Sequence, residues 1–221
     1  MNSKFPRVLV KTATSAALTL AVLTLCSAAQ AQNWNFKVGV LRYDTHAKTT
    51  GIQGIGVPPG ADADVGDATT LVFTLERMFN DNVGFELALG IPPRTKARGA
   101  GSVAFLGDDV LSAKNVAPSF LVNYHFGDKN TAFRPYIGLG ANYTVFKSVK
   151  SKLAPQVTMS DSFGLAAHAG IDYAISKHMG LYASIARVDV RTDLVAVGSV
   201  VLTSSIDFRP WTYSAGLRVS F

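Results

Sequence analysis

Residues 211–221 read WTYSAGLRVSF, and every second residue of this stretch is apolar. The apolar set is Trp211, Tyr213, Ala215, Leu217, Val219 and Phe221. The residues between them are small, hydroxylated or charged. A period of two places successive side chains on opposite faces of an extended chain. The stretch therefore predicts a β-strand with one apolar face and one face of small and polar residues.

The same alternation occurs in seven further segments of the chain. These are Trp34–Val40, Leu71–Leu75, Val83–Ile91, Val116–Phe126, Phe133–Phe146, Phe163–Tyr173 and Met179–Ile185. Tilted strands of about ten residues cross a bilayer, whereas a spanning helix needs about 18 consecutive apolar residues, which no segment after residue 31 approaches. The sequence therefore predicts an all-β fold, an eight-stranded antiparallel transmembrane β-barrel.

A soluble β-sandwich or a lipocalin-like barrel would also alternate, but either needs a large apolar interior. Here the second face is rich in Gly, Ala, Ser and Thr. Small side chains suit the inside of an eight-stranded barrel, whose lumen is nearly filled by side chains. This composition favours the membrane barrel over the soluble alternatives.

The connections between the predicted strands fall into two classes. Tight turns are expected at 80–82, 127–131 and 176–177, and longer polar or Gly-rich loops at 44–66, 97–112, 147–160 and 194–206. Short turns on one side and long loops on the other are typical of barrels with periplasmic turns and extracellular loops.

Residues 1–31 predict a cleaved signal peptide, with a basic start, an apolar stretch at 12–26 and small residues at Ala29 and Ala31. Cys26 could instead carry a lipid, although the bulky Leu25 before it argues against this. The barrel domain then spans 32–221. Removal of three of the 21 basic residues leaves 18 against 15 acidic ones, so we expect no nucleic-acid partner. The expected location is the outer membrane of a Gram-negative bacterium.

Several inward-facing residues near the short turns are charged or titratable. If Phe79 pairs with Val83, Glu76 lies opposite Glu86, and two facing carboxylates require cations. We predict a salt-bridged plug at the periplasmic end, formed by Lys37, Glu76, Glu86, His125, Arg134, Asp172 and Arg218. The alternative is a catalytic acid/base pair, because facing carboxylates can shift each other's proton affinity. The neighbouring cations favour the plug.

The inward residues toward the loops are more apolar. Leu41, Tyr43, Val72, Leu121, Phe146, Tyr182 and Val188 are the predicted channel-lining residues. An apolar funnel above a polar plug would admit a hydrophobic molecule and block its straight passage to the periplasm. The alternative is that these side chains only fill the lumen.

No motif in the chain indicates catalysis or a bound cofactor. The four histidines lack metal-ligand spacing, and Gly138 and Gly140 lack the third glycine and the following helix of a dinucleotide site. No nucleophile elbow is present. We therefore expect a protein that is not an enzyme and has no cofactor or metal.

Several motifs resemble the OmpW family, in order along the chain. They are DNVGFEL at 81–87, NYHFG at 123–127, FRPYIGLGANYT at 133–144, DSFG at 161–164 and AGLRVSF at 215–221. GDATTL at 66–71 and GIPPR at 90–94 are similar to the alkane-uptake branch of that family. The resemblance implies an eight-stranded outer-membrane barrel with a narrow hydrophobic channel that releases small molecules sideways through the barrel wall.

Proline removes a hydrogen bond of the strand ladder. Pro92, Pro93 and Pro118 lie on the third and fourth predicted strands, so we expect the lateral gap between these strands, beside 97–112. The terminal Phe221 resembles the recognition signal for the barrel-assembly machinery. The other expected partners are outer-membrane lipid, lipopolysaccharide and a small hydrophobic substrate.

The expected function is a passive, non-enzymatic outer-membrane channel for uptake of small hydrophobic molecules. The alternative is a structural or partner-binding small barrel with a closed lumen. An ion-conducting porin is disfavoured, because eight strands leave little free lumen.

Overall fold

The computed structural model describes residues 33–45 and 48–221. The predicted signal peptide, Cys26 and the expected domain start at Gln32 lie outside these ranges. Residues Asn33–Ser220 form one compact unit. Within the described ranges, no helix has the length and hydropathy needed to cross a membrane.

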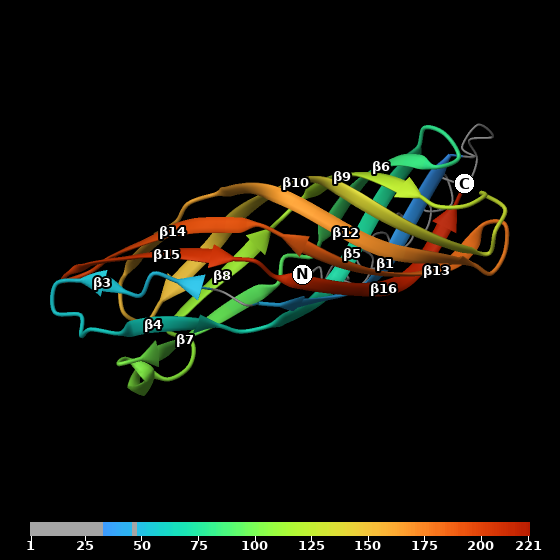
Figure 1. Cartoon of the computed structure of the whole chain (residues 1–221). Coiled ribbons are helices and arrows are strands. Elements are labelled where there is room, and N and C mark those ends of the chain that lie inside the picture. The colour runs from blue at the N-terminus through green and yellow to red at the C-terminus, as the bar shows by residue number, and fades with distance from the viewer. Residues whose placement is uncertain (1–32, 46–47) are drawn as a thin grey trace, which may run out of the picture. The chain divides into compact units, whose positions relative to one another are not determined.

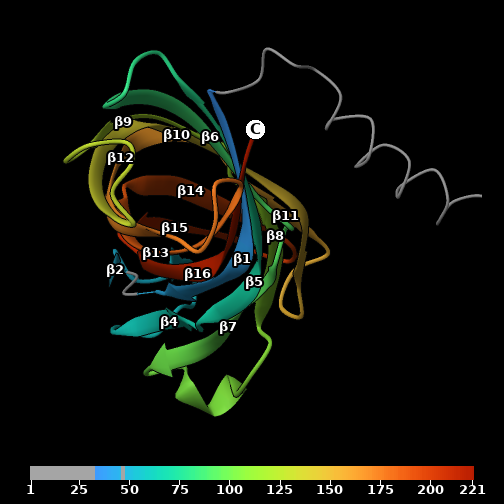
Figure 2. The same ribbon diagram turned by 90° about the vertical axis from the view of Figure 1, so that its right-hand side faces the viewer.

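Eight antiparallel strands form a closed barrel (Figure 1). In chain order they are β1 (Trp34–Asp44), β5 (Ala68–Met78), β6 (Val83–Gly90), β9 (Ser119–His125), β10 (Phe133–Ser151), β12 (Ser162–Ala174), β13 (Met179–Val188) and β16 (Trp211–Ser220). Each pairs with the next, and β16 pairs with β1 to close the ring (Figure 2). The predicted eight-stranded barrel is confirmed.

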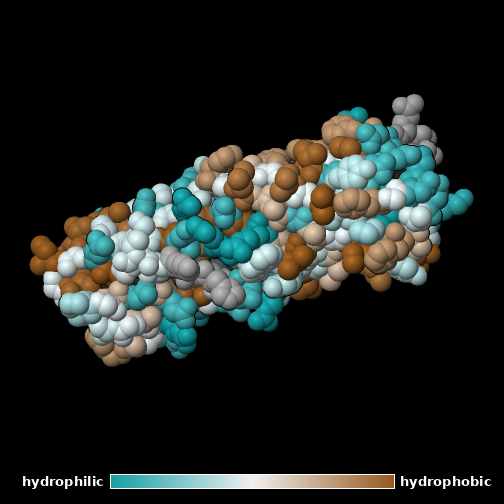
Figure 3. Space-filling view, viewed as in Figure 1, coloured by the Kyte–Doolittle hydropathy of each residue, from teal (hydrophilic) through white to brown (hydrophobic). Residues whose placement is uncertain are grey.

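The apolar face of each strand points outward. Leu139, Phe163 and Leu165 are each at least 70% exposed, although they are large and apolar. In Figure 3, hydrophobic side chains gather over the barrel strands and hydrophilic ones cover the end with the short turns. An exterior of this kind is the expected contact surface for lipid.

Three of the tight connections match their predicted places. The turn at Asn80–Asn82 is closed by Asn80, whose Oδ1 accepts hydrogen bonds from the backbone amides of Asn82 and Val83 at 2.9 and 2.8 Å. Gly127 adopts a φ of +77°, which favours glycine, at the start of the second turn.

The segments expected to be long loops are largely strands. They contain β2 (Lys48–Thr49), β3 (Gln53–Gly54), β4 (Ala61–Val65), β7 (Arg94–Gly101), β8 (Leu111–Val116), β11 (Gln156–Met159), β14 (Val190–Val197) and β15 (Val201–Phe208), with a short 3-10 helix, η2 (Ala104–Leu106). β4, β7 and β8 extend the barrel sheet beside β10, and β11, β14, β15 and β2 form a second sheet.

Candidate functional site: an apolar cavity above a buried ion cluster

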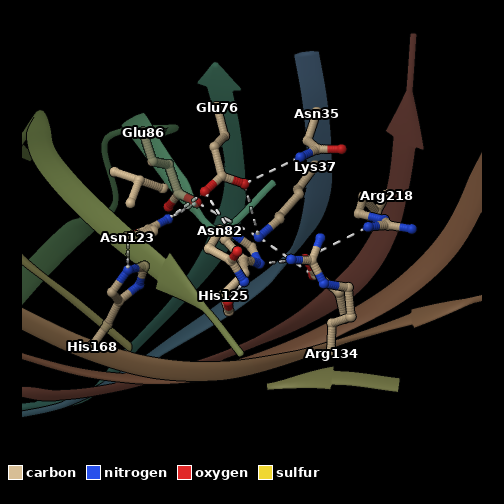
Figure 4. A network of polar contacts seen from close by, with 12 residues as sticks. Asn35, Lys37, Glu76, Asn82, Glu86, Asn123, His125, Arg134, His168 and Arg218 are labelled. Carbon is tan, nitrogen blue, oxygen red and sulfur yellow. Dashed lines mark hydrogen bonds and ion pairs between the residues drawn. The ribbon is translucent and has the colours of Figure 1, made fainter. Parts of the chain in front are cut away.

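Lys37 lies at the centre of a buried ion cluster inside the barrel (Figure 4). Its side chain is 1% exposed, and its Nζ lies 3.4 Å from Asp172, 3.6 Å from Glu86 and 3.9 Å from Glu76. The lysine comes from β1 and the carboxylates from β12, β6 and β5. One cation therefore connects carboxylates from three separate parts of the barrel wall.

Glu76 and Glu86 face each other across β5 and β6, as the position of the Asn80–Asn82 turn predicted. Nδ2 of Asn123 donates hydrogen bonds to both carboxylates, at 2.7 Å to Glu76 and 3.2 Å to Glu86. Nε2 of His125 lies 2.8 Å from Oε1 of Glu76. Like charges directly opposite each other destabilise a strand pair, and these partners offset that repulsion.

The remaining predicted plug residues lie at the side of the cluster. Nη1 of Arg218 lies 3.7 Å from Oδ2 of Asp172, and Nδ1 of His125 lies 3.8 Å from the same oxygen. Arg134 instead donates from Nη2 to the backbone carbonyl of Asp81 at 2.6 Å. The structure thus brings six of the seven residues into direct contact, and Arg134 lies at their margin.

The sequence analysis missed four neutral members of the cluster, namely Asn35, Asn123, Tyr136 and His168. The ring centroid of Tyr136 lies 4.2 Å from Nζ of Lys37, and Nε2 of His168 lies 2.7 Å from Oδ1 of Asn123. All four have the inward parity of their strands, so the period-two pattern contained the signal. They were missed because the prediction of the plug considered mainly charged residues.

Two glycines make room for these large side chains. A Cβ at Gly138 would collide with Oδ1 of Asn123 and Nε2 of His168, and one at Gly170 would collide with the ring of Tyr136. Large polar side chains on one strand therefore lie over glycine residues on the neighbouring strand. This pairing of large with small fills the narrow lumen at this level.

Chemically, the buried cluster holds three carboxylates and two cations, Lys37 and Arg218, with Arg134 at its margin. Glu76 is fully buried and Glu86 is 3% exposed, and both are bound by Lys37 and Asn123. A buried ion set of this kind is costly to break, because each ion left without its partner remains desolvated. The arrangement is better suited to connecting the strands across the lumen than to a reactive carboxylate pair.

On the loop side of the cluster lies a largely apolar cavity of about 140 Å³. Six of the seven predicted channel-lining residues form part of its wall, namely Leu41, Tyr43, Val72, Leu121, Phe146 and Val188. Tyr182 does not, because its ring lies on the level of the ions, 5.7 Å from Nζ of Lys37. An apolar cavity of about 150 Å³ is large enough to bind benzene.

The wall of this cavity is interrupted between β6 and β9. Their ladder ends at the pair Ala88 and Ser119, and pairing resumes only at Arg94 and Lys114, between β7 and β8. The unpaired stretches are 89–93, which contains Pro92 and Pro93, and 115–118, which contains Pro118. The interruption therefore lies between the third and fourth barrel strands, beside these three prolines.

The cavity reaches both margins of this interruption. Leu89, Gly90 and Pro93 line it on one side, and Asn115 and Ala117 on the other. Nδ2 of Asn142, on β10, binds the carbonyls of Ala117 and Pro118 at 3.3 and 3.1 Å. The carbonyl of Pro118 also accepts a hydrogen bond from the backbone amide of Tyr143 at 3.0 Å, so this margin is bound to β10 rather than to β6.

A search for metal ligands gave no candidate. Among the residues that the structure describes, no group of three or more His, Cys, Asp or Glu side chains has an arrangement that could hold an ion.

Comparison with known proteins gives consistent matches. The family model described as OmpW family matches residues 31–221. Outer membrane protein W of Vibrio cholerae is 33% identical over 158 residues, which cover 67% of this chain and 72% of that protein. Outer membrane protein AlkL of Ectopseudomonas oleovorans is 26% identical over 76% of this chain and 73% of its own.

Two further matches come from Pseudomonas aeruginosa. The dibenzothiophene metabolism operon protein PahQ is 30% identical over 169 residues, covering 75% of this chain and 77% of that protein. The crystal structure of the outer membrane protein OprG superposes with a TM-score of 0.78 at 28% identity, covering 86% of this chain and 96% of that one.

Proposed function

Because this chain belongs to the OmpW family of outer-membrane barrels, we propose that it is a passive conduit for small hydrophobic molecules. The molecules enter from the loop side, occupy the apolar cavity and leave sideways through the interruption between β6 and β9. The proposed route ends in the outer membrane, and no step of it requires catalysis.

The observation that carries the proposal is the apolar cavity with an ionic floor and an interrupted side wall. Lys37, Glu86 and Asp172 lie below the cavity and are almost fully buried, so a desolvated hydrocarbon gains nothing by moving toward them. Between Ala88 and Arg94 the side wall lacks a continuous ladder, and its margin is joined by one long backbone hydrogen bond, from the amide of Asn115 to the carbonyl of Pro93 at 3.4 Å. The sideways exit is therefore the route of lower cost.

The cavity supports small, uncharged, apolar molecules as the substrate class. A volume of about 140 Å³ fits a single ring or a short chain before any movement of the wall. The relative PahQ is named for a dibenzothiophene metabolism operon, and dibenzothiophene is an uncharged aromatic compound. Larger members of the class would need the interruption to widen.

A disulfide across the interruption tests the proposed exit. Cys26 is the sole cysteine of the sequence and precedes residue 32. Two cysteines introduced into the barrel therefore meet no competing thiol there. The variant Gly90→Cys/Ala117→Cys places one thiol on each margin. Uptake of a labelled alkane or aromatic hydrocarbon is then measured in whole cells, with expression matched to the parent and to an unrelated eight-stranded barrel.

The matched control is Ala88→Cys/Ser119→Cys, the last intact pair of the same seam. Oxidation should abolish uptake through the first variant, reduction should restore it, and the control should transport in both states. Full uptake by the oxidised first variant would eliminate the lateral exit. No uptake by any form, the parent included, would reject the conduit itself.

One observation favours the alternative of a structural or partner-binding barrel with a closed lumen. The hairpin tips expose aliphatic side chains, with Ile55 at 86% and Val201 at 54% exposure. A surface of this kind suits contact with another molecule. If uptake fails across several hydrophobic compounds, these tips are the first place to search for a partner.

A further inference from the structure

Three cations lie side by side on the outer face of the sheet just beyond the barrel. Arg94 on β7 pairs with Lys114 on β8, and Lys114 pairs with Lys147 on β10. Directly opposite residues share one face of a sheet, with Cβ atoms about 5 Å apart. The three side chains therefore form one row across three strands.

This row has no internal compensation. All three side chains are exposed, and within the described residues none of them forms an ion pair or a hydrogen bond with an acidic group. Like charges directly opposite each other cost stability. A row that the fold itself leaves uncompensated is suited to an external anion.

The row points toward the lipid side at the upper edge of the apolar band. On β10, Ile137, Leu139 and Tyr143 face outward, and Lys147 follows with the same parity. Tyr143 pairs with the exposed Phe163, and aromatic residues mark the membrane interface. Lys147 lies four residues beyond Tyr143, or about 13 Å along the strand. Because barrel strands are tilted by about 40°, Lys147 rises about 10 Å above these aromatic residues, at the outer side of the membrane interface.

A second row continues the positive face. Lys96 pairs with Ser112, which pairs with Lys150. Asp109 binds Nζ of Lys96 at 3.0 Å, and among the residues that the structure describes no ion pair to Lys150 is found. Arg94, Lys96 and Lys150, together with Lys152, Asp109 and two serines, line a shallow depression on this face.

We propose that this face binds the phosphate groups of the glycolipid in the outer leaflet, with Arg94, Lys114 and Lys147 as the principal contacts. On and beside this face, seven cations outnumber four carboxylates. The cations are Arg94, Lys96, Arg98, Lys114, Lys147, Lys150 and Lys152, and the carboxylates are Asp64, Asp67, Asp108 and Asp109. Basic side chains near an anionic membrane surface are drawn to it. The partner is a phosphorylated lipid A headgroup, fixed by its acyl chains at the height of the row.

The site also borders the proposed exit. The pair Arg94 and Lys114 is the first ladder pair beyond the interruption between β6 and β9. A headgroup bound there would lie over the upper margin of that interruption. The binding site itself rests only on the barrel's location in the outer membrane, so it stands even if the conduit proposal fails.

The test uses the purified barrel in detergent micelles and fluorescently labelled lipid A carrying two phosphates. The variant Arg94→Gln/Lys114→Gln/Lys147→Gln removes the row. A cation at an anionic surface is worth about fivefold in binding, so three should give a loss of about a hundredfold. The control Arg77→Gln/Lys129→Gln/Lys177→Gln removes the same charge near the short turns and should bind like the parent.

Two further probes identify the ligand. Dephosphorylated lipid A should bind the parent and the triple variant equally weakly, and millimolar inorganic phosphate should not displace the labelled lipid from the parent. Equal binding of phosphorylated lipid A by parent and triple variant would overturn the proposal. Displacement by inorganic phosphate would overturn its lipid assignment. The heat-modified gel mobility of each variant reports that the barrel is folded.

Discussion

Substitution of Lys37 by methionine is the most direct test of the ion cluster. Methionine has a similar length and no charge, so Glu76, Glu86 and Asp172 lose their shared cation without a large change in volume. At an effective dielectric constant of about 20, contacts of 3.4, 3.6 and 3.9 Å are each worth about 4–5 kcal/mol of attraction.

Most of this attraction offsets the desolvation of the ions in the parent barrel. Removal of one partner from a buried ion set typically costs about 3–5 kcal/mol. We expect Lys37→Met to lower the free energy of unfolding by that amount. The measurement is urea unfolding of the barrel in lipid vesicles, followed by tryptophan fluorescence and gel mobility.

A double-mutant cycle separates charge from packing. Glu86→Gln on the Lys37→Met background removes one of the stranded carboxylates and should recover part of the loss, with a coupling energy of about 1–3 kcal/mol. The surface control is Arg42→Gln, whose ion pair with Asp67 is largely exposed and should contribute less than about 1 kcal/mol. A loss below about 1 kcal/mol for Lys37→Met, or strict additivity in the cycle, would refute the account of the cluster.

Three further outcomes are expected. Gly138→Ala should lower the free energy of unfolding by about 1–3 kcal/mol in the same urea assay, because the new methyl group collides with Asn123 and His168. Gly90→Ala, whose methyl group would have no contact closer than 3.6 Å, should lower it by less. Equal losses for the two variants would contradict the packing of large side chains against these glycines. Val72→Trp places an indole in the cavity wall and should reduce hydrocarbon uptake at least tenfold, whereas Leu71→Trp, which faces lipid, should leave it unchanged; similar uptake by the two variants would argue against the cavity route. Glu86→Ala should raise the ion conductance of the barrel in planar bilayers, and an unchanged conductance would count against a plug.

The barrel could be predicted from the sequence because its strands alternate between apolar and small or polar residues. The last strand, 211–220, displays this in every position, and the facing of Glu76 and Glu86 followed from one turn. The position of a turn fixes the register of its hairpin, so the sequence of the turn was sufficient to place Glu76 opposite Glu86.

The strands beyond the membrane could not be predicted from alternation between apolar and polar residues. In β7, Arg94, Lys96 and Arg98 alternate with Thr95, Ala97 and Gly99, which is an alternation of charged with small residues. A criterion based on hydrophobicity does not register this pattern, although its period is two. The part of β7 from residue 97 onward was therefore expected to belong to a loop.

The candidate site was predictable in part. Parity gave the inward residues, and charge selected Lys37 and its carboxylates, but neither could show that Asn123 bridges them or that Tyr182 lies beside the ions rather than in the cavity wall. Those facts depend on the stagger of strands far apart in the sequence. Stagger is a property of the closed barrel as a whole.

The distribution of the cluster over the strands has a consequence for how the barrel assembles. Lys37 lies on the first strand, Arg218 on the last, and the acids on strands between them, so no single hairpin holds the whole set of these ions. An unclosed sheet in lipid would carry bare charges, at a cost of several kcal/mol for each ion. Only the complete ring brings Lys37 and Arg218 to Asp172. Closure of the ring therefore stabilises the ions that an open sheet would leave without their partners.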